Sequence, residues 1–105
     1  MKEIIFNLPE ALPKEFETFQ SLIETDNILI EKIISTGQKT PLNQWLEDER
    51  NEWVILLQGE AEIIFQNDSA QNLKAGDYLF IPKNKKHRVN YTSENPCCIW
   101  LAVYY

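Results

Sequence analysis

Residues 52–65 read E-W-V-I-L-L-Q-G-E-A-E-I-I-F, and residues 76–91 read G-D-Y-L-F-I-P-K-N-K-K-H-R-V-N-Y. Both stretches are rich in β-branched and aromatic residues and are broken by glycine or proline, which is typical of short strands joined by tight turns. Glu52 opens the first stretch, and His87, the only histidine of the chain, lies in the second. If the two strands are neighbours in a closed sheet, Glu52 and His87 face the same interior.

The same strand pattern continues along the rest of the chain. Strands are predicted at residues 2–6, 28–35, 52–57, 60–66, 70–74, 78–81, 87–92 and 97–104. The Gln58-Gly59 pair is predicted to form a tight hairpin between two of them. Turn signals at intervals of about eight to twelve residues indicate an all-β sandwich or barrel.

The N-terminal segment has a different pattern. Phe16, Phe19, Leu22 and Ile23 are spaced as on one face of a short amphipathic helix. We therefore expect a short N-terminal helical arm that covers a sheet face or edge, or packs on a partner subunit.

Length and composition indicate one globular domain. The chain has 105 residues, of which 44% are hydrophobic and 11% aromatic, so a single domain over residues 1–105 is expected. No apolar run approaches the about 20 residues of a membrane span, and the start of the chain lacks a secretion signal. A cytoplasmic protein without a membrane partner is therefore expected.

The charge of the chain bears on its partners. The net charge of −6 would repel a phosphate backbone, so nucleic acid is not an expected partner. A short basic cluster is formed by Lys83, Lys85, Lys86 and Arg88. We interpret this cluster as the solvated rim of a loop, and the alternative is an entrance that attracts a small anionic ligand.

Two motifs in this chain resemble those of the cupin family. The first is matched by Gly37, Glu52 and Gly59, and the second by Gly76, Pro82 and His87. Together they cover roughly residues 37–91. The resemblance implies a jelly-roll barrel, the double-stranded β-helix, and a small-molecule ligand. It also implies pairing into a homodimer and leaves isomerase, dioxygenase, decarboxylase and sensor roles open.

The metal ligands of the family are incomplete in this chain. The usual metal-binding members use three histidines and one glutamate, whereas this chain has one histidine. The two missing histidine positions fall either on Trp45 and Glu47 or on Leu46 and Asp48. Each alternative places one apolar residue and one carboxylate there.

Three interpretations of Glu52 and His87 remain open. In the first, they bind a divalent metal ion (Zn, Mn or Fe) with Glu47 or Asp48 as a further ligand, and the protein acts on a small anionic molecule. In the second, they form a metal-free, hydrogen-bonded acid–base pair with catalytic roles. In the third, the pair is a structural remnant in a barrel that only binds, senses or assembles. Whether the protein is an enzyme is left open.

Several aromatic side chains are candidates for ligand binding. Such residues are more often ordinary core, and the alternative is that they line an apolar pocket. The residues that could line such a pocket are Trp45, Tyr78, Phe80, Tyr91 and Trp100. Of these, Trp45, Tyr78 and Tyr91 are the predicted ligand-binding residues. Tyr91 is the best of them, because strand alternation places it on the same face as His87.

Overall fold

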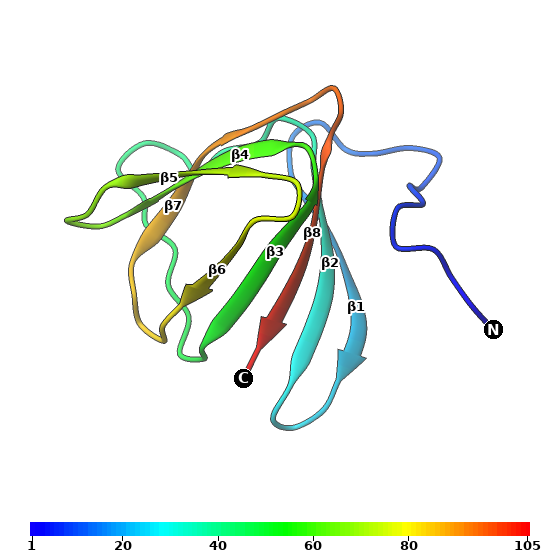
Figure 1. Cartoon of the computed structure of the whole chain (residues 1–105), viewed down its shortest axis with the longest axis horizontal. Coiled ribbons are helices and arrows are strands. Elements are labelled where there is room, and N and C mark those ends of the chain that lie inside the picture. The colour runs from blue at the N-terminus through cyan, green and yellow to red at the C-terminus, as the bar shows by residue number, and fades with distance from the viewer.

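The computed structural model describes all 105 residues and consists of strands, turns and loops (Figure 1). The strands are β1 (Thr18–Glu24), β2 (Leu29–Ser35), β3 (Glu52–Gln58), β4 (Glu60–Phe65), β5 (Ala70–Lys74), β6 (Tyr78–Ile81), β7 (His87–Thr92) and β8 (Cys98–Tyr104). None of its segments is a helix that could span a bilayer.

The strands form two antiparallel sheets, which confirms the predicted all-β sandwich. One sheet has five strands in the order β1-β2-β8-β3-β6, and the other has three in the order β5-β4-β7. Alternate residues of the strands point inward and make the core, as strand geometry requires. The core consists of Ile33, Val54, Leu56, Ala61, Ile63, Leu73, Ile81, Cys98, Trp100 and Ala102.

The predicted hairpin at Gln58-Gly59 is wrong. β3 pairs with β6 and β8, whereas β4 pairs with β5 and β7, so the chain crosses between the sheets at this turn. Gly59 has a φ of 92°. A Cβ at this position would lie 2.8 Å from Ser93 Oγ and 2.9 Å from Cys98 Sγ, which is closer than packed atoms approach. The glycine therefore permits a sharp, tightly packed crossing and not a two-stranded turn.

The predicted N-terminal helical arm is also wrong, and so is the strand at residues 2–6. Residues 2–6 form no strand, and Thr18–Glu24 forms β1, which pairs with β2 at the edge of the five-stranded sheet. The helical spacing of Phe16, Phe19 and Ile23 is coincidental in so short a run. Pairing to β2 decides the conformation, since β-branched and aromatic residues fit a half-exposed edge strand.

The loop between β2 and β3 runs along the edge of β7. Leu46 and His87 exchange both backbone hydrogen bonds, at 2.7 and 3.0 Å. Further along, Thr40 donates its backbone N–H to the Val89 carbonyl at 2.8 Å. The loop thus closes one side of the sandwich and places Leu46 beside His87.

Candidate functional site

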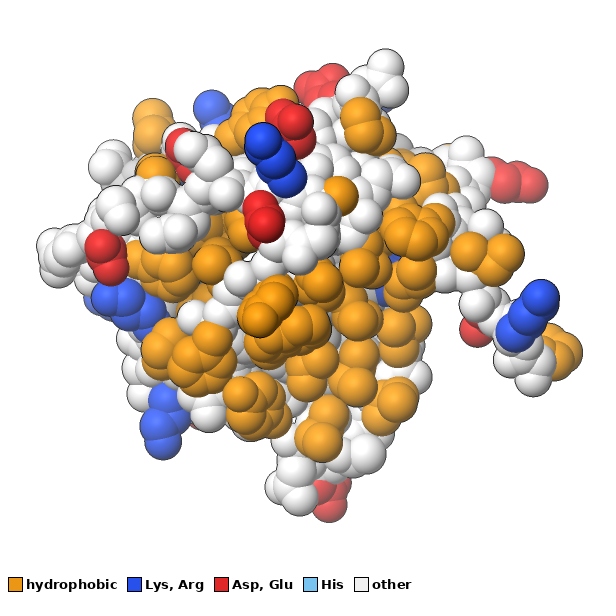
Figure 2. All heavy atoms as spheres, viewed as in Figure 1, with side chains coloured by type: hydrophobic (Ala, Val, Ile, Leu, Met, Phe, Trp, Pro, Cys, Tyr) orange, Lys and Arg blue, Asp and Glu red, His pale blue; other side chains and the backbone are white.

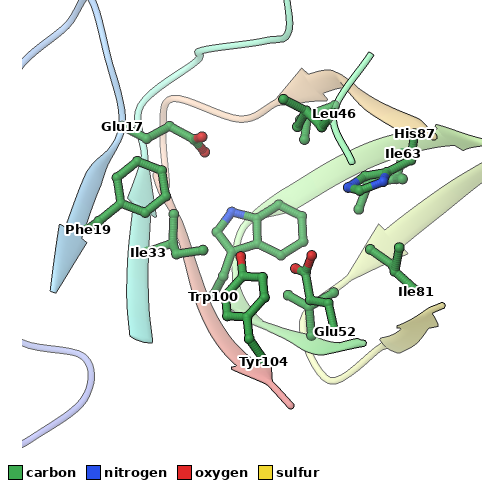
Figure 3. A pocket seen from close by; sticks show the side chains of 12 residues that line it. Glu17, Phe19, Ile33, Leu46, Glu52, Ile63, Ile81, His87, Trp100 and Tyr104 are labelled. Carbon is green, nitrogen blue, oxygen red and sulfur yellow. The ribbon is translucent and has the colours of Figure 1, made fainter. Parts of the chain in front are cut away.

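A cavity of about 180 Å³ lies between the two sheets. Its wall is mostly apolar and is formed largely by Phe19, Ile33, Leu46, Val54, Ile63, Ile81, Val89 and Trp100. Four further side chains bring polar atoms into this wall: Glu17, Glu52, His87 and Tyr104. Figure 3 shows these side chains from close by.

Glu52 begins β3 on the inner face of the five-stranded sheet. Removal from water raises the pKa of its carboxyl to about 7, and the negative charges of Asp48 and Glu31 add to this rise. The Tyr104 hydroxyl and the Arg50 charge act in the opposite direction. At neutral pH the Glu52 carboxyl is therefore divided between its protonated and its charged form, which suits a group that exchanges a proton.

Tyr104, on the last inward position of β8, stands next to Glu52. Burial and the negative charge of Glu52 raise the pKa of the Tyr104 phenol. The phenol therefore keeps its proton at neutral pH and can act as a hydrogen-bond donor in the cavity wall.

Glu17 precedes β1 and reaches the cavity from its other side. Its carboxyl accepts a hydrogen bond from Ser35 Oγ, which in turn accepts one from Trp100 Nε1 at 3.0 Å. Burial raises the pKa of Glu17, and the Ser35 hydrogen bond lowers it. In Figure 3 the Trp100 indole lies between the carboxyl groups of Glu17 and Glu52. Sequence reasoning missed Glu17 because its segment was expected to form a helix.

His87 enters the cavity from β7, in the three-stranded sheet. Its side chain is buried, with 7% of its surface exposed. Nδ1 lies 2.9 Å from the Lys85 carbonyl, which can only accept, so Nδ1 carries the hydrogen. In the tautomer with its hydrogen on Nδ1, Nε2 is an acceptor available to a molecule in the cavity.

Glu52 and His87 line one cavity but belong to opposite sheets. They make no hydrogen bond or ion pair with each other, and the only ion pair of the structure joins Arg50 to Asp48. The directly hydrogen-bonded acid–base pair is therefore not formed. Both groups can instead contact the same bound molecule, and their catalytic role stays a prediction.

None of the three aromatic residues predicted to bind a ligand lines the cavity. Trp45, Tyr78 and Tyr91 are 36%, 64% and 51% exposed. Tyr91 leaves the His87 face because the β4–β7 register shifts between Glu62 and Ile63, so that Asn90 is an extra residue in β7. Such a bulge breaks strand alternation. The rings in the wall are those of Phe19, Tyr104 and Trp100, and Trp100 is the one pocket candidate of the sequence that lines the cavity.

The basic cluster also lies outside the cavity. Lys83 and Lys86 are exposed, and no lysine or arginine is among the residues of the wall. Arg88 is buried, but its guanidinium donates to the Thr40 carbonyl at 2.8 Å. The interpretation of the cluster as a solvated loop rim fits Lys83 and Lys86 and is wrong for Arg88, and none of the four residues lines the cavity.

Comparison with known proteins identifies the family. The family model described as cupin domain matches residues 33–104, more than half of the chain. The chain belongs to the cupin family. No curated protein sequence gives a significant match.

Solved structures give the same fold for this cupin. A protein of Ralstonia eutropha JMP134, described as a candidate mannose-6-phosphate isomerase, is 34% identical, with a TM-score of 0.91 over 99% of this chain and 96% of that chain. A cupin superfamily protein of Desulfitobacterium hafniense DCB-2 is 21% identical, with a TM-score of 0.75 over 90% of this chain and 81% of that chain. An RmlC-like cupin of Methanocaldococcus jannaschii, described as a double-stranded β-helix, is 19% identical, with a TM-score of 0.71 over 99% of this chain and 91% of that chain.

The residues of this cupin do not fit the metal centre of its metal-binding relatives. No three His, Cys, Asp or Glu side chains gather as a metal ion would need. Of the two alternatives for the missing histidine positions, Leu46 and Asp48 place a residue beside His87, because Leu46 forms a bridge with His87 and lines the cavity. Leu46 offers no ligand atom, and Glu47 is exposed.

Asp48, the one carboxylate left at those positions, is already engaged. Its Oδ1 accepts from Arg50 Nε at 3.0 Å, and its Oδ2 accepts from the same guanidinium at 3.1 Å. The Arg50 hydrogen bonds hold the pKa of Asp48 below its ordinary value. Glu52 and His87 thus remain as the two possible metal ligands, and they lie on opposite walls. A typical catalytic zinc site has three protein ligands.

Proposed function

We propose that this cupin binds a small organic molecule in the cavity between its sheets, without a metal ion. The observation that carries the proposal is the cavity wall, in which a few polar groups point into an otherwise apolar surface. Such a combination is typical of small-molecule sites, where apolar contacts supply affinity and the polar groups fix orientation. A volume of about 180 Å³ suits an occupant near the size of benzene, which fills a cavity of about 150 Å³.

The name carried by the Ralstonia relative offers less guidance about the ligand. Mannose-6-phosphate carries a phosphate, and no lysine or arginine lines the cavity of this chain. A phosphate there would lose its water and face Glu17 and Glu52, which is costly without a cationic partner. We therefore do not extend a sugar-phosphate substrate to this protein.

A second candidate function is proton transfer on the bound molecule. It is favoured by the Glu52 carboxyl, with a pKa of about 7, facing His87 Nε2 across one cavity. A group whose pKa lies near the working pH is suited to give and take protons. This candidate predicts solvent deuterium incorporation into a bound carbonyl compound, lost in Glu52→Gln, whereas a binding module exchanges nothing.

The binding proposal is tested by filling the cavity. Ile63 points into the cavity from β4, and its neighbour Ile64 lies on the other face of the same strand. Ile63→Phe should abolish the rise in melting temperature produced by phenol or benzyl alcohol, and Ile64→Phe should retain it. Val89→Ile, a smaller change in the same wall, serves if Ile63→Phe does not fold.

Two outcomes would contradict the proposal. Equal ligand responses in Ile63→Phe and Ile64→Phe would place binding outside the cavity. Loss of binding after treatment with a chelator, with recovery on adding a divalent metal, would show that the site needs a metal ion. Unchanged binding in chelator is the expected result.

A further inference from the structure

We infer that the molecule bound in this cavity is a small organic cation, an ammonium group on an apolar body, held by Glu17 and Glu52 beside Trp100. The inference rests on the proposed binding function and adds the chemical class of the ligand. It follows from the charges, the acceptor atoms and the rings of the cavity wall.

The carboxyl groups of the wall have no lysine or arginine beside them. Glu17 and Glu52 are the only side chains in the wall that form anions at neutral pH, and no lysine or arginine accompanies them. Asp48 and Glu31 add negative charge near Glu52, and Arg50 is already paired to Asp48. Two carboxyls in an apolar cavity are unfavourable when charged, and a cation in the same cavity offsets part of that penalty.

The carboxyls also keep unused acceptor atoms. Ser35 bonds one oxygen of Glu17, Oε2, and no protein donor bonds the other. The protein donor that acts on Glu52 is the Tyr104 hydroxyl. An ammonium group has three N–H donors and no acceptor, so it complements these oxygens more fully than a hydroxyl or a carboxylate could.

The relay behind Glu17 holds its carboxyl in place. Trp100 Nε1 donates to Ser35 Oγ at 3.0 Å, and Ser35 donates to Glu17. The same indole lines the cavity between the two carboxyl groups (Figure 3). A cation beside an indole face gains a further favourable contact.

Proton release should accompany binding. Burial raises the pKa of Glu52 to about 7, so part of this carboxyl is protonated near neutral pH and a cation must displace that proton. Burial also raises the pKa of Glu17. Other groups that face Glu52 are Asp48, Glu31, Tyr104 and Arg50, and His87 lies across the cavity. Affinity for a cation should therefore rise between pH 6 and pH 8, by up to about tenfold per pH unit for each proton released.

The experiment compares three probes of one shape: benzylammonium, benzyl alcohol and benzoate, titrated calorimetrically into the full-length protein at pH 6 and pH 8. Benzylammonium should bind most tightly, with affinity rising toward pH 8, and benzoate should bind least. Glu17→Gln and Glu52→Gln should each weaken benzylammonium by about tenfold or more and leave benzyl alcohol within about twofold. Glu60→Gln, an exposed carboxyl outside the cavity, is the matched control and should change neither.

The outcomes separate this inference from the proposed function. If benzyl alcohol or benzoate binds as tightly as benzylammonium, or if neither Gln variant weakens benzylammonium, the ligand is not a cation, although the cavity still binds small molecules. If no probe binds, both the cation and the proposed function are wrong.

Discussion

The two faces of the five-stranded sheet are built from alternate residues of the same strands, yet they differ in chemistry. On the inner face, Glu52 and Tyr104 place polar atoms among apolar neighbours in the cavity wall. On the outer face, cross-strand pairs bring apolar side chains together into one surface. This outer patch consists of Trp53, Ile55, Tyr78, Phe80, Leu101 and Val103. Figure 2 shows apolar side chains spread over the strands of this sheet.

The difference indicates what each face is suited to contact. A polar atom in an apolar wall costs free energy unless something bonds to it, so the inner face is suited to a ligand with a polar group. The outer patch offers a broad apolar surface, on which Tyr78 and Phe80 are 64% and 51% exposed. Such a patch fits another protein surface better than a small molecule. The homodimer remains a prediction, and we propose the outer patch as its interface.

The largest expected effect is on the packing of the inner face. Leu56 has 0% of its surface exposed, and Leu56→Ala should lower the free energy of unfolding by about 2–5 kcal/mol because it leaves a cavity. Leu101→Ala, on the outer patch, should cost about 1 kcal/mol or less in a single chain. Urea denaturation measures both. Equal losses of unfolding free energy would show that the outer patch is as fully buried as the core. The proposed difference between the two faces would then be wrong.

The next effect is a dependence of stability on pH that the outer patch cannot produce. Folding raises the pKa of Glu52 from 4.5 to about 7, so the folded state binds the proton more tightly. The stabilisation is complete below pH 4.5 and is lost as the pH rises to about 7. The loss is about 3 kcal/mol at most, because each pKa unit corresponds to about 1.4 kcal/mol.

This linkage is measured by denaturation at a series of pH values between 5 and 8. Burial also raises the pKa of Glu17, which adds to the loss with the same sign. Glu52→Gln should flatten the curve and be relatively more stable than the unmodified protein at pH 8. A protein whose stability rises from pH 5 to pH 8, and does so equally in Glu52→Gln, would show that this carboxyl is not buried as described.

Local sequence patterns predicted the strands well and their pairing less well. β-branched runs ended by glycine, proline or Asn-Asp mark most strand boundaries, since these residues act on their own backbone. Gly59 predicts a hairpin wrongly because a glycine turn has the same sequence pattern whether the next strand pairs with the preceding strand or crosses to the other sheet. The local pattern of β1 predicts a helix because it does not contain the pairing with β2 that decides the conformation of this segment.

In the candidate site, too, local sequence predicts some residues correctly and long-range pairing decides the others. Glu52 and His87 were placed in one interior because their positions within strand motifs set their direction. Tyr91 was misplaced by the bulge at Asn90, which is visible only in the register of β4 against β7. Glu17 was missed because its place in the wall depends on the pairing of β1 with β2 and on Ser35. The one sequence signal for Glu17 is its place directly before the alternating Thr-Phe-Gln run, which is compatible with a strand.

A smaller effect is expected from the hydrogen-bond relay behind the inner face. Ser35→Ala removes the acceptor of Trp100 Nε1 and the donor to Glu17, both of them in the interior. A buried polar group left without its partner costs about 1–3 kcal/mol. Thr36→Ala, next in the chain, loses the hydrogen bond that its half-buried hydroxyl donates to Pro13 and the one that it accepts from Gln38 Nε2, and should cost about 1 kcal/mol or less. Equal stabilities of the two variants would mean that the relay does not stabilise the fold.

The smallest effect on the stability of the single chain should come from the outer patch. A substitution in this patch therefore distinguishes a loss of folding stability from a loss of dimer formation. Phe80→Ser should change the unfolding free energy of one chain by about 0.5 kcal/mol or less, because the side chain is already 51% exposed. If a second copy covers the patch, the same change should weaken the dimer by about tenfold or more. Sedimentation over a concentration series measures this, with Gln71→Ser on the exposed face of β5 as the control. If the unmodified protein sediments as a single chain at every concentration, the homodimer prediction is wrong. The apolar outer patch would then be exposed to water and not covered by a second copy.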